Sequence, residues 1–257
     1  LKVVRAGGGH QTKSLRLEDK QGRDYNLRAL KKNALQFLQT VAFKDKKIKD
    51  DFKNTLAQEA IEDFYTAAHP YGFLVVPTLA KAIGVAHTNP KLFYIPKQAA
   101  LGNYNDEYGD EIYMLVERPE DDWLGSGKFN NPNKDIQSSS GLFEHLRRDE
   151  EYKLDESAYI RARLFDMLLG DWDRHQDQWR WGENKMPNGN KMFYPIPRDR
   201  DQVFSNYDGA FFATIRGIAG FANQFGTYEP MIKDLAWFNS AAAGLDRTLI
   251  QNQGKGA

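Results

Sequence analysis

Five aspartates stand close together between residues 171 and 201. Asp171, Asp173 and Asp177 lie in the segment GDWDRHQDQW, and Asp199 and Asp201 follow in the segment PRDRDQ. Phosphoryl transfer asks little covalent chemistry of a protein. One carboxylate orients the attacking hydroxyl, and oxygen ligands hold the divalent metal that bridges the phosphates. The number and spacing of these carboxylates therefore indicate a metal-dependent phosphotransfer centre.

The order of the side chains assigns a role to each of them. Asp173 is the candidate for the carboxylate that orients and deprotonates the hydroxyl. Gln178, five residues later, and Asp199 are the candidate ligands of Mg²⁺ or Mn²⁺, and Asp201 is a rival for the metal role. We expect Asp173 and Asp199 to act together, because a helix, a loop, a hairpin and a strand end follow one another in the order that this chemistry needs.

Several neighbours of these residues have open roles. Arg174 and His175 either anchor the loop or meet phosphate, since a guanidinium group offers paired donors to phosphate oxygens. Taken singly, Asp171, Asp177 and Asp201 also fit solvated surface turns. The tryptophans that flank the loop fit either stacking on a substrate or, more commonly, a buried aromatic framework.

A helix and a hairpin are predicted to position the two segments. The sequence LDESAYIRARLFDMLLG, residues 154–170, has Asp155 as a candidate N-cap and Gly170 just past the last turn. Its predicted apolar face consists of Ile160, Leu164, Met167 and Leu168. The strands WRWGEN and KMFYPIP, joined by the turn MPNGN, form a predicted hairpin between the acidic segments.

The first part of the chain combines strand and helix patterns. TKSLRL and DYNLRAL have the two-residue alternation of strands, LKVVRA is strand-like, and glycine-containing turns separate the three. NTLAQEAIEDFYTAA, residues 54–68, has apolar residues at helical spacing, and PTLAKAIG is a second helix with Pro77 in its first turn. The strands KLFYIP and EIYMLVERP follow, separated by a polar loop. These patterns predict an antiparallel sheet with one or two helices.

The later part is predicted to be mainly helical. Residues 125–141, GSGKFNNPNKDIQSSSG, cluster glycine, asparagine and serine without an apolar period, which indicates a linker or mobile loop. A further helix is expected in DLAWFNSAAAGL. The predicted fold class is α+β with two lobes: an antiparallel-sheet lobe over residues 1–119 and a mainly helical lobe over residues 120–257.

Composition excludes several classes of site and partner. The 257 residues carry 35 basic and 35 acidic side chains, so the overall charge gives no reason to expect nucleic acid as a partner. The absence of cysteine excludes disulfides, thiolate catalysis and zinc–thiolate sites. No apolar run of roughly 18 residues occurs, so we expect no direct membrane insertion. The strand-like start at Leu1 suggests a piece of a longer protein, whose other domains we expect as partners.

The acidic segments resemble those of known kinases. DRHQDQ is similar to the DRHxxN pattern of phosphatidylinositol 3- and 4-kinases and to the DRHxxE pattern of the secretory-pathway kinases. PRDRDQVF resembles the Asp-x-Asp-x-x-Phe segment of the spore-coat-protein-H kinases, in which an aspartate coordinates metal. The resemblance implies a two-lobed protein-kinase-like fold that binds ATP with Mg²⁺ or Mn²⁺ and transfers the terminal phosphate to a hydroxyl acceptor.

A wider resemblance covers residues 5 to about 240. GGGHQTKSLRL, AAHPYGFLVVPTLAKAIGV, ERPEDDW and YPIPRDRDQVFS are similar to segments of an uncharacterised domain of long exported Bacteroidetes proteins. That domain often accompanies a metallophosphoesterase-like domain. This resemblance implies a periplasmic or cell-envelope location and says little about activity.

The kinase resemblance also implies phosphate contacts in the first lobe. The turn formed by Gly7, Gly8 and Gly9 would cover the phosphates. Arg28, on the third strand, would contact them where kinases generally have lysine. Arg28 in place of lysine, and Gln178 in place of asparagine or glutamate, are departures from the kinase pattern.

Two further roles follow from the same resemblance. Glu59, Glu62 or Asp63 would hold the cationic side chain, and Glu59 and Asp63 stand one turn apart on the same face of the predicted helix. Glu117 and Arg118, at the end of the last strand of the first lobe, would form the hinge whose backbone meets the adenine.

Three functions are compatible with the sequence. The first is an ATP-dependent kinase-like phosphotransferase. The second is a catalytically inactive, pseudokinase-like binding or scaffolding domain of an exported multidomain protein, which the two departures motivate. The third is a metal-dependent phosphoesterase that uses the same aspartates. The shortage of histidine weakens this third function, because two-metal hydrolases commonly employ several imidazoles.

Overall fold

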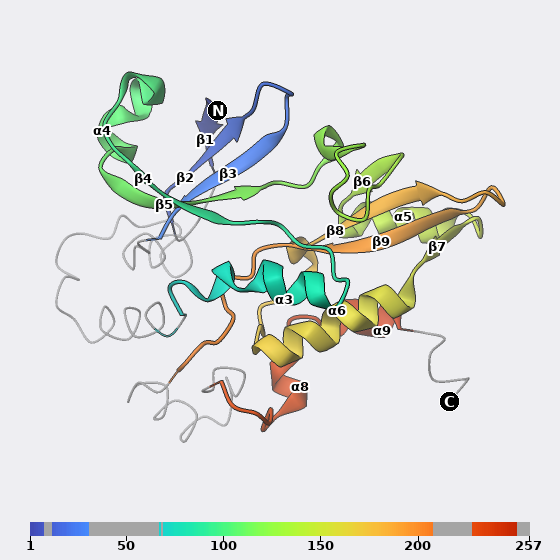
Figure 1. The fold of residues 1–257 in the computed structure, drawn as a ribbon. Coiled ribbons are helices and arrows are strands. Elements are labelled where there is room, and N and C mark those ends of the chain that lie inside the picture. The colour runs from blue at the N-terminus through green and yellow to red at the C-terminus, as the bar shows by residue number, and fades with distance from the viewer. Residues whose placement is uncertain (8–11, 31–66, 68, 208–227, 251–257) are drawn as a thin grey trace, which may run out of the picture. The chain divides into compact units, whose positions relative to one another are not determined.

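The computed structural model describes residues 1–7, 12–30, 67, 69–207 and 228–250 (Figure 1). Within these ranges the chain is a mixed α/β protein with two sheets. In the same part of the chain, no helix combines the length and the apolar character needed to span a bilayer. The predictions for Gly8, Gly9, Glu59, Glu62 and Asp63 lie outside the described residues.

The chain divides into two compact units. The first consists of Leu1–Pro70 and Asn89–Arg118, and the second of Tyr71–Thr88 and Pro119–Ala257. The sequence prediction divided the chain once, near residue 119. The structure instead adds the short segment before β4 to the second unit, because its buried apolar side chains belong to the core of that unit.

The first unit is built on a five-stranded antiparallel sheet with the strand order β1-β2-β3-β5-β4. Its strands are Lys2–Ala6 (β1), Ser14–Glu18 (β2), Asp24–Ala29 (β3), Lys91–Ile95 (β4) and Glu111–Glu117 (β5). All five strands were predicted from their sequence patterns. Gly22, with a φ of +79°, lies in the turn between β2 and β3, where the sequence placed it.

One face of this sheet carries the core of the first unit, which includes leucines of β2 and β3 and Tyr113 of β5. Between β4 and β5 the chain forms η3 (Ala99–Tyr104) and α4 (Asn105–Tyr108). Leu101 and Tyr108 of this segment are buried in the same core. The prediction of a polar loop for this segment was therefore wrong. A few apolar side chains are enough to dock a mainly polar segment on the sheet.

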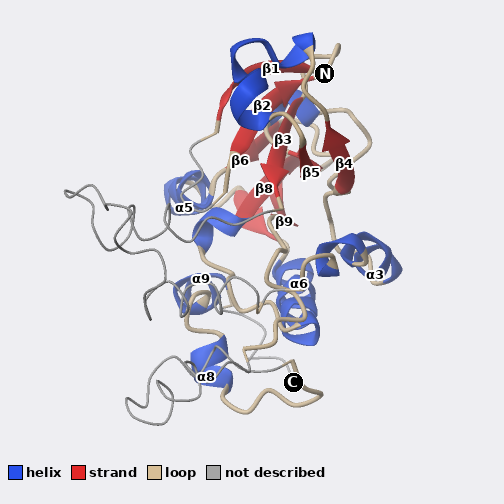
Figure 2. Ribbon diagram, turned by 90° about the vertical axis from the view of Figure 1, so that its left-hand side faces the viewer, coloured by secondary structure: helices blue, strands red, loops and turns tan. Residues whose placement is uncertain are grey.

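The second unit combines short helices with a second sheet. Its elements are η2 (Gly72–Leu74), α3 (Val76–Ala82), η4 (Asp121–Trp123), β6 (Asp135–Gln137), α5 (Ser139–Arg148), β7 (Tyr152–Leu154), α6 (Glu156–Leu169), η5 (Gln176–Gln178), β8 (Trp179–Lys185), β9 (Lys191–Pro197), α8 (Leu235–Phe238) and α9 (Ala243–Leu249). The strand order is β6-β8-β9-β7, with β7 parallel to β9 and the other pairs antiparallel. Figure 2 labels β6, β8 and β9 of this sheet. The predicted hairpin is confirmed as β8 and β9. The second unit was predicted to be mainly helical, and the structure adds a four-stranded sheet to its helices.

Strand β6 and the start of α5 lie in the segment whose composition predicted a linker. The N–H of Ile136 donates to Asp121 Oδ1 at 2.8 Å, and the Ile136 side chain is buried. Ser138 caps α5, since its hydroxyl accepts the N–H of Gly141 at 3.2 Å. The linker prediction was wrong because serine is favoured at helix caps as well as in flexible loops.

Helix α6 buries a different face from the predicted one. Leu164 and Leu168 are 59% and 63% exposed, whereas Tyr159, Arg163 and Asp166 are buried. Two charged residues thus interrupt the apolar pattern on the buried face. They are tolerated there because each is paired with an opposite charge, and hydrophobic spacing alone cannot reveal such pairing.

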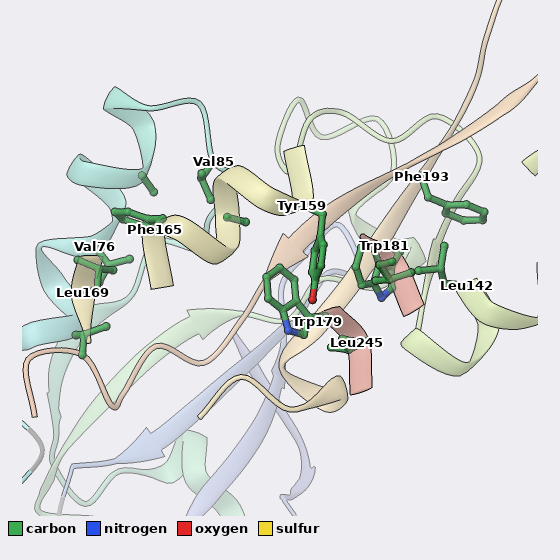
Figure 3. Close-up of a cluster of buried hydrophobic side chains, with 14 residues drawn as sticks. Val76, Val85, Leu142, Tyr159, Phe165, Leu169, Trp179, Trp181, Phe193 and Leu245 are labelled. Carbon is green, nitrogen blue, oxygen red and sulfur yellow. The ribbon is translucent and has the colours of Figure 1, made fainter. Parts of the chain in front are cut away.

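An aromatic cluster forms the centre of the second unit. Figure 3 shows Tyr159 between Trp179 and Trp181, with ring centroids 5.2 and 5.7 Å from those of the two indoles. Both tryptophans are fully buried, so the framework interpretation is confirmed for them. Val76 of α3 and Leu245 of α9 belong to the same cluster.

The single helix predicted near the end of the chain is divided in two. Asp234 caps α8, with its side chain accepting the N–H of Trp237 at 3.0 Å. The chain turns after Phe238 and re-enters helix at α9. Leu245 of α9 is buried, so both short helices belong to the packed part of the second unit.

Candidate active site

The end of α6 sets the start of the acidic loop. Asp155 caps the helix, its side chain accepting the N–H of Ala158 at 2.8 Å. Gly170 ends the helix in the left-handed conformation with a φ of +67°, and both residues act as the sequence predicted. A β-carbon at Gly170 would lie 2.7 Å from the ring of Tyr228. Backbone and packing therefore both require glycine here, and the chain turns directly into Asp171.

Two buried carboxylates hold two arginines beneath this loop. Asp166 of α6 and Asp171 are fully buried. Arg174 lies 3.4 Å from Asp166 (Nε to Oδ2) and 3.6 Å from Asp171 (Nη1 to Oδ2). Arg200 lies 2.5 Å from Asp166 (Nη1 to Oδ1) and 3.4 Å from Asp171 (Nη1 to Oδ2). Arg174 belongs to the first acidic segment and Arg200 to the second, so one pair of carboxylates joins both segments.

A third arginine pairs with the same cluster. Arg163 donates to Asp166 (Nη1 to Oδ2) at 2.7 Å and to Asp246 of α9 (Nε to Oδ1) at 2.9 Å. It also donates to the side-chain oxygen of Asn239 at 2.5 Å. Three arginines thus face three aspartates. The pairing of each guanidinium group with carboxylates makes its burial tolerable, because an unpaired buried charge is strongly destabilising.

The two buried carboxylates titrate in opposite directions. Burial by itself would raise the pKa of Asp166, but the guanidinium groups of Arg200, Arg174 and Arg163 outweigh it and lower that pKa. Burial raises the pKa of Asp171 to about 7, and the arginines, at longer distances, do not offset it. Asp166 is therefore the charged centre of the cluster.

Arg174 anchors the loop and does not reach solvent. Its side chain is 1% exposed. Nη1 donates to the carbonyl of Arg198 at 2.7 Å and Nη2 to the carbonyl of Gln178 at 3.3 Å, while the guanidinium carbon lies 4.8 Å from the ring centroid of Trp179. Of the two roles that the sequence left open for Arg174, the structure supports anchoring. Burial excludes the direct phosphate contact.

Asp173 and His175, on either side of this arginine, remain accessible, with side chains 29% and 43% exposed. Nε2 of His175 lies 3.8 Å from Asp173 Oδ1, and Nδ1 is 3.3 Å from the N–H of Asp177. Nδ1 is thus placed to accept the N–H of Asp177, while Nε2 faces both Asp173 Oδ1 and the side-chain nitrogen of Gln178, which lies 3.3 Å away. The histidine thus lies beside the carboxylate of Asp173.

Asp199 and Asp201 follow β9. Asp199 has a φ of +49°, a left-handed conformation that is uncommon for any residue other than glycine. Oδ1 of Asp201 accepts from the amide of Gln202 at 3.2 Å, and Gln202 in turn accepts the hydroxyl of Tyr207 at 3.0 Å. These contacts orient a second acidic segment beside the first.

Charge links the two segments. Burial raises the pKa of Asp173 above its ordinary range. The charge of His175 opposes this shift, and the carboxylates of Asp201 and Asp199 add to it. Asp173 therefore lies within electrostatic reach of both aspartates of the second segment.

Gln178 lies at the base of the first loop. Its side-chain nitrogen is 3.3 Å from Nε2 of His175, and its carbonyl accepts the N–H of Arg198 at 2.8 Å. The amide thus contacts the histidine of its own loop. Its candidate role as a metal ligand stays a prediction.

The oxygen donors of this region suit a divalent metal without forming a complete protein cage. Among the described residues, no group of three His, Asp or Glu side chains could hold a metal ion. Mg²⁺ is commonly bound by one or two carboxylates and completes its shell with water and phosphate oxygens. Asp199 and Asp201 offer such carboxylates, and their role as metal ligands stays a prediction.

Sequence reasoning missed three residues of this region. Ser139, buried at the start of α5, donates to the carbonyl of Gln176 at 2.7 Å and accepts from Trp181 Nε1 at 3.0 Å, which ties the loop to the aromatic cluster. Asp166 and Arg200 were missed as well. The available signals were weak: Asp166 has the i,i+3 spacing of a helical ion pair with an arginine, and Arg200 repeats the Asp-Arg order of the first segment.

In the first unit, the structure gives a structural role to the first glycine of the predicted phosphate turn. The N–H of Gly7 donates to the carbonyl of Ser14 at 2.7 Å, and a β-carbon on Gly7 would lie 2.1 Å from the hydroxyl of Ser14. Arg28 is half-buried on β3, opposite Met114 of β5 and on the face away from the leucine core. Phosphate contacts of Gly7 and Arg28 stay predictions.

The predicted hinge is partly occupied by contacts within the first unit. The N–H of Arg118 donates to the carbonyl of Asp24 at 3.0 Å. The side chain of Glu117 is buried and accepts the N–H of Asn89 at 2.6 Å. The N–H of Arg118 is thus already satisfied, so an adenine contact at this strand end would have to use other backbone groups.

Comparison with known proteins adds little to this geometry. No protein-family model and no curated protein matches the chain. The Rio2 kinase of Chaetomium thermophilum in its ADP, Mg²⁺ and phosphoaspartate complex is similar at 16% identity, with a TM-score of 0.40 over 97% of this chain and 68% of that chain. A second structure of this Rio2 kinase gives 16% identity and a TM-score of 0.38, over 96% of this chain and 70% of that chain. These scores are low, and the chemistry of the site has to come from its own residues.

Proposed function

We propose that the chain is a kinase-like phosphotransferase that uses ATP and a divalent metal to phosphorylate a hydroxyl group. One observation carries the proposal. Asp173 of the first segment lies close enough to Asp199 and Asp201 of the second for both to raise its pKa. A carboxylate with a raised pKa beside oxygen donors suited to a metal is the combination that phosphoryl transfer needs.

Asp173 is the proposed base. The hydroxyl oxygen of the acceptor attacks the terminal phosphorus of ATP, and the new O–P bond forms as the bond from that phosphorus to the bridging oxygen of ADP breaks. The hydroxyl proton passes to the carboxylate of Asp173. A raised pKa improves this carboxylate as a proton acceptor, because general-base catalysis is most effective when the pKa lies near the working pH. His175, whose Nε2 lies 3.8 Å from Asp173 Oδ1, is the neighbour of this carboxylate in the proposed site.

Asp199 and Asp201 are the proposed ligands of Mg²⁺ or Mn²⁺, with Gln178 as a third candidate. Such an ion, when bound, would supply positive charge against the transferring phosphate. Hard carboxylate oxygens suit both ions. On the kinase resemblance alone, we also propose that Gly7 and Arg28 contact the phosphates.

Titration calorimetry of the whole chain with a non-hydrolysable ATP analogue and Mg²⁺ tests the proposal. We expect binding that requires the metal and that Asp199→Ala abolishes. Asp177→Ala is the matched control, since it removes a neighbouring carboxylate whose side chain is 84% exposed. A folded wild-type sample that binds no analogue with either metal would refute the proposal.

A pseudokinase-like binding or scaffolding domain of an exported multidomain protein, in the periplasm or cell envelope, is the second candidate. Two observations favour it: the amide of Gln178 contacts His175, and the N–H of Arg118 is already paired with Asp24. This candidate predicts nucleotide binding without any transfer of labelled phosphate, to other acceptors or to the chain itself, even with Mn²⁺. Transfer that is lost in Asp173→Asn would exclude it.

A further inference from the structure

The two acidic segments share one construction. The first reads Asp173-Arg174-His175 and the second Asp199-Arg200-Asp201. In each, the central arginine is buried while the residues on either side remain partly exposed. In each segment a buried arginine thus lies directly between two partly exposed candidate site residues.

The guanidinium groups of both arginines contact the same two carboxylates. Arg174 and Arg200 each lie within 3.6 Å of Asp166 and of Asp171. An aromatic ring supports each guanidinium group, Trp179 at 4.8 Å for the first and Phe165 at 5.0 Å for the second. A guanidinium group is planar and rigid, so it can bridge two carboxylates in a fixed geometry. The two arginines are therefore held at a set separation.

Stability alone does not account for this arrangement. Buried ion clusters can often be replaced by apolar residues of similar volume without loss of stability, because desolvation of the charges offsets their attraction. A cluster that joins two loops can, however, define how those loops lie relative to one another. We propose that Asp166 and Asp171 are positioning residues that, through Arg174 and Arg200, fix the separation between Asp173 and the Asp199–Asp201 pair.

This inference rests on the proposed function for the roles of those three outer carboxylates. The clamp itself, defined as Asp166, Asp171, Arg174 and Arg200, is a separate structural claim. Residues that hold metal ligands in place without touching the metal themselves commonly contribute about 10- to 100-fold to metal affinity. Loss of the clamp should therefore weaken binding of a metal–nucleotide complex by a factor in this range.

Arg163 provides a matched control. It pairs with Asp166 at 2.7 Å, as the clamp arginines do, but its other contacts are Asp246 and Asn239, outside both acidic segments. Arg163→Lys disturbs the same buried cluster and should lower the free energy of unfolding. A purely structural role for the cluster predicts that Arg163→Lys and a clamp variant of equal stability behave alike at the site.

The first measurement is titration calorimetry of the whole chain with ADP and Mn²⁺. We expect Asp171→Ala to raise the dissociation constant about 10- to 100-fold, Asp171→Asn to restore part of the affinity, and Arg163→Lys to match the wild type. Asp171→Asn keeps an oxygen acceptor for both arginines, which is why it restores binding in part. If Asp171→Ala does not fold, Arg200→Lys takes its place, because it keeps the positive charge but removes the guanidinium plane that lies 5.0 Å from the ring centroid of Phe165.

The second measurement needs no nucleotide. Hydrogen–deuterium exchange of the free chain follows the amides of Gln178, Arg198 and Phe204, which donate to the carbonyls of residues 175, 178 and 169. We expect Asp171→Ala to speed exchange in both acidic segments together, and Arg163→Lys to leave both segments protected. This pattern supports the clamp.

Each outcome distinguishes the clamp from the proposed function. If the folded wild type binds no ADP with Mn²⁺, the proposed function fails and the exchange measurement alone decides the clamp. The clamp is overturned if Asp171→Ala speeds exchange in one segment only or in neither. It is equally overturned if Arg163→Lys, at the same loss of stability, changes exchange or affinity as much as the clamp variant does.

Discussion

Asp173 combines two properties that are hard to obtain together. Its side chain remains accessible because Arg174 beside it takes the buried position. Its pKa is nevertheless raised, by burial first and then by the two carboxylates of the second segment. A carboxylate on an open surface turn would be accessible but would keep an ordinary pKa, and a fully buried one would not meet a substrate.

The substitution Asp173→Asn separates catalysis from stability. We expect it to lower the rate of phosphate transfer, measured with labelled ATP, by about 10²- to 10⁴-fold, the usual contribution of a general base. Because a raised pKa means that the charged form is disfavoured in the folded state, the free energy of unfolding at pH 7 should not fall. Asp177→Asn, on an exposed side chain of the same loop, is the control and should change neither quantity. A rate for Asp173→Asn equal to that of the wild type would rule out the base.

The residues of the site were predictable where their chemistry is local and unpredictable where it depends on distant partners. Asp173, Asp199 and Asp201 stand in short segments whose composition signals a site. The role of Arg174 was left open, because its decisive partner is Asp166, which a sequence shows only as one polar residue of a helix. Asp171 looked like a surface residue for the same reason, and the structure buries it completely.

Helix α6 links the core of the second unit to the site. Its ends followed from sequence, because a capping carboxylate at Asp155 and a left-handed glycine at Gly170 act through their own backbone neighbourhood. Its buried face did not follow. Arg163 and Asp166 are buried because oppositely charged partners from elsewhere in the chain neutralise them. The helical periodicity of apolar residues does not indicate such partners.

Gly170→Ala tests how strictly the helix end is defined. Gly125 is a matched control, since its φ is also +67° but no atom lies within 4 Å of its added β-carbon. We expect Gly125→Ala to lower the free energy of unfolding by about 1 kcal/mol, the cost of a left-handed residue. Gly170→Ala should cost roughly 1–3 kcal/mol more, because its β-carbon would overlap the ring of Tyr228.

That ring cannot move aside without loss of its own contacts. Its hydroxyl donates to the carbonyl of Leu168 at 2.8 Å, and its ring packs edge-on against Phe204. Urea denaturation of the two variants and the wild type measures the difference. Equal losses in the two variants would show that the contact with Tyr228 does not constrain the helix end.

At the scale of the whole molecule, the two units differ in how far their sequences reveal them. The strands of the first unit alternate in polarity and are separated by glycine turns, so each was recognisable. The sheet of the second unit is completed by β6 and β7, which are three residues long. Strands of that length are too short to show a period, and the serine and asparagine around β6 resemble a linker. The hairpin β8–β9 alone had the length to be predicted.

The buried carboxylates of the second unit should shape the pH dependence of unfolding for the whole chain. The pKa of Asp171 is raised from 3.8 to about 7, and that of Asp173 is raised as well. A carboxyl group whose pKa is raised in the folded state contributes stability that is complete below its ordinary pKa. This contribution is lost as pH rises through the pKa of the folded state. The pKa of Asp166 is lowered, so its contribution is present above the ordinary pKa and is lost only in stronger acid.

We therefore expect the wild-type free energy of unfolding to fall from pH 5 to pH 8. The contribution of Asp171 to this slope is at most about 1.4 kcal/mol per pH unit, the value for one proton. Asp171→Asn carries no titrating group at this position, so its free energy of unfolding should fall less over the same range. Urea denaturation of both proteins at pH 5, 6, 7 and 8 measures the two slopes. Parallel slopes would mean that Asp171 titrates alike in the folded and unfolded chain, and that its carboxyl is ionised between the two arginines at neutral pH.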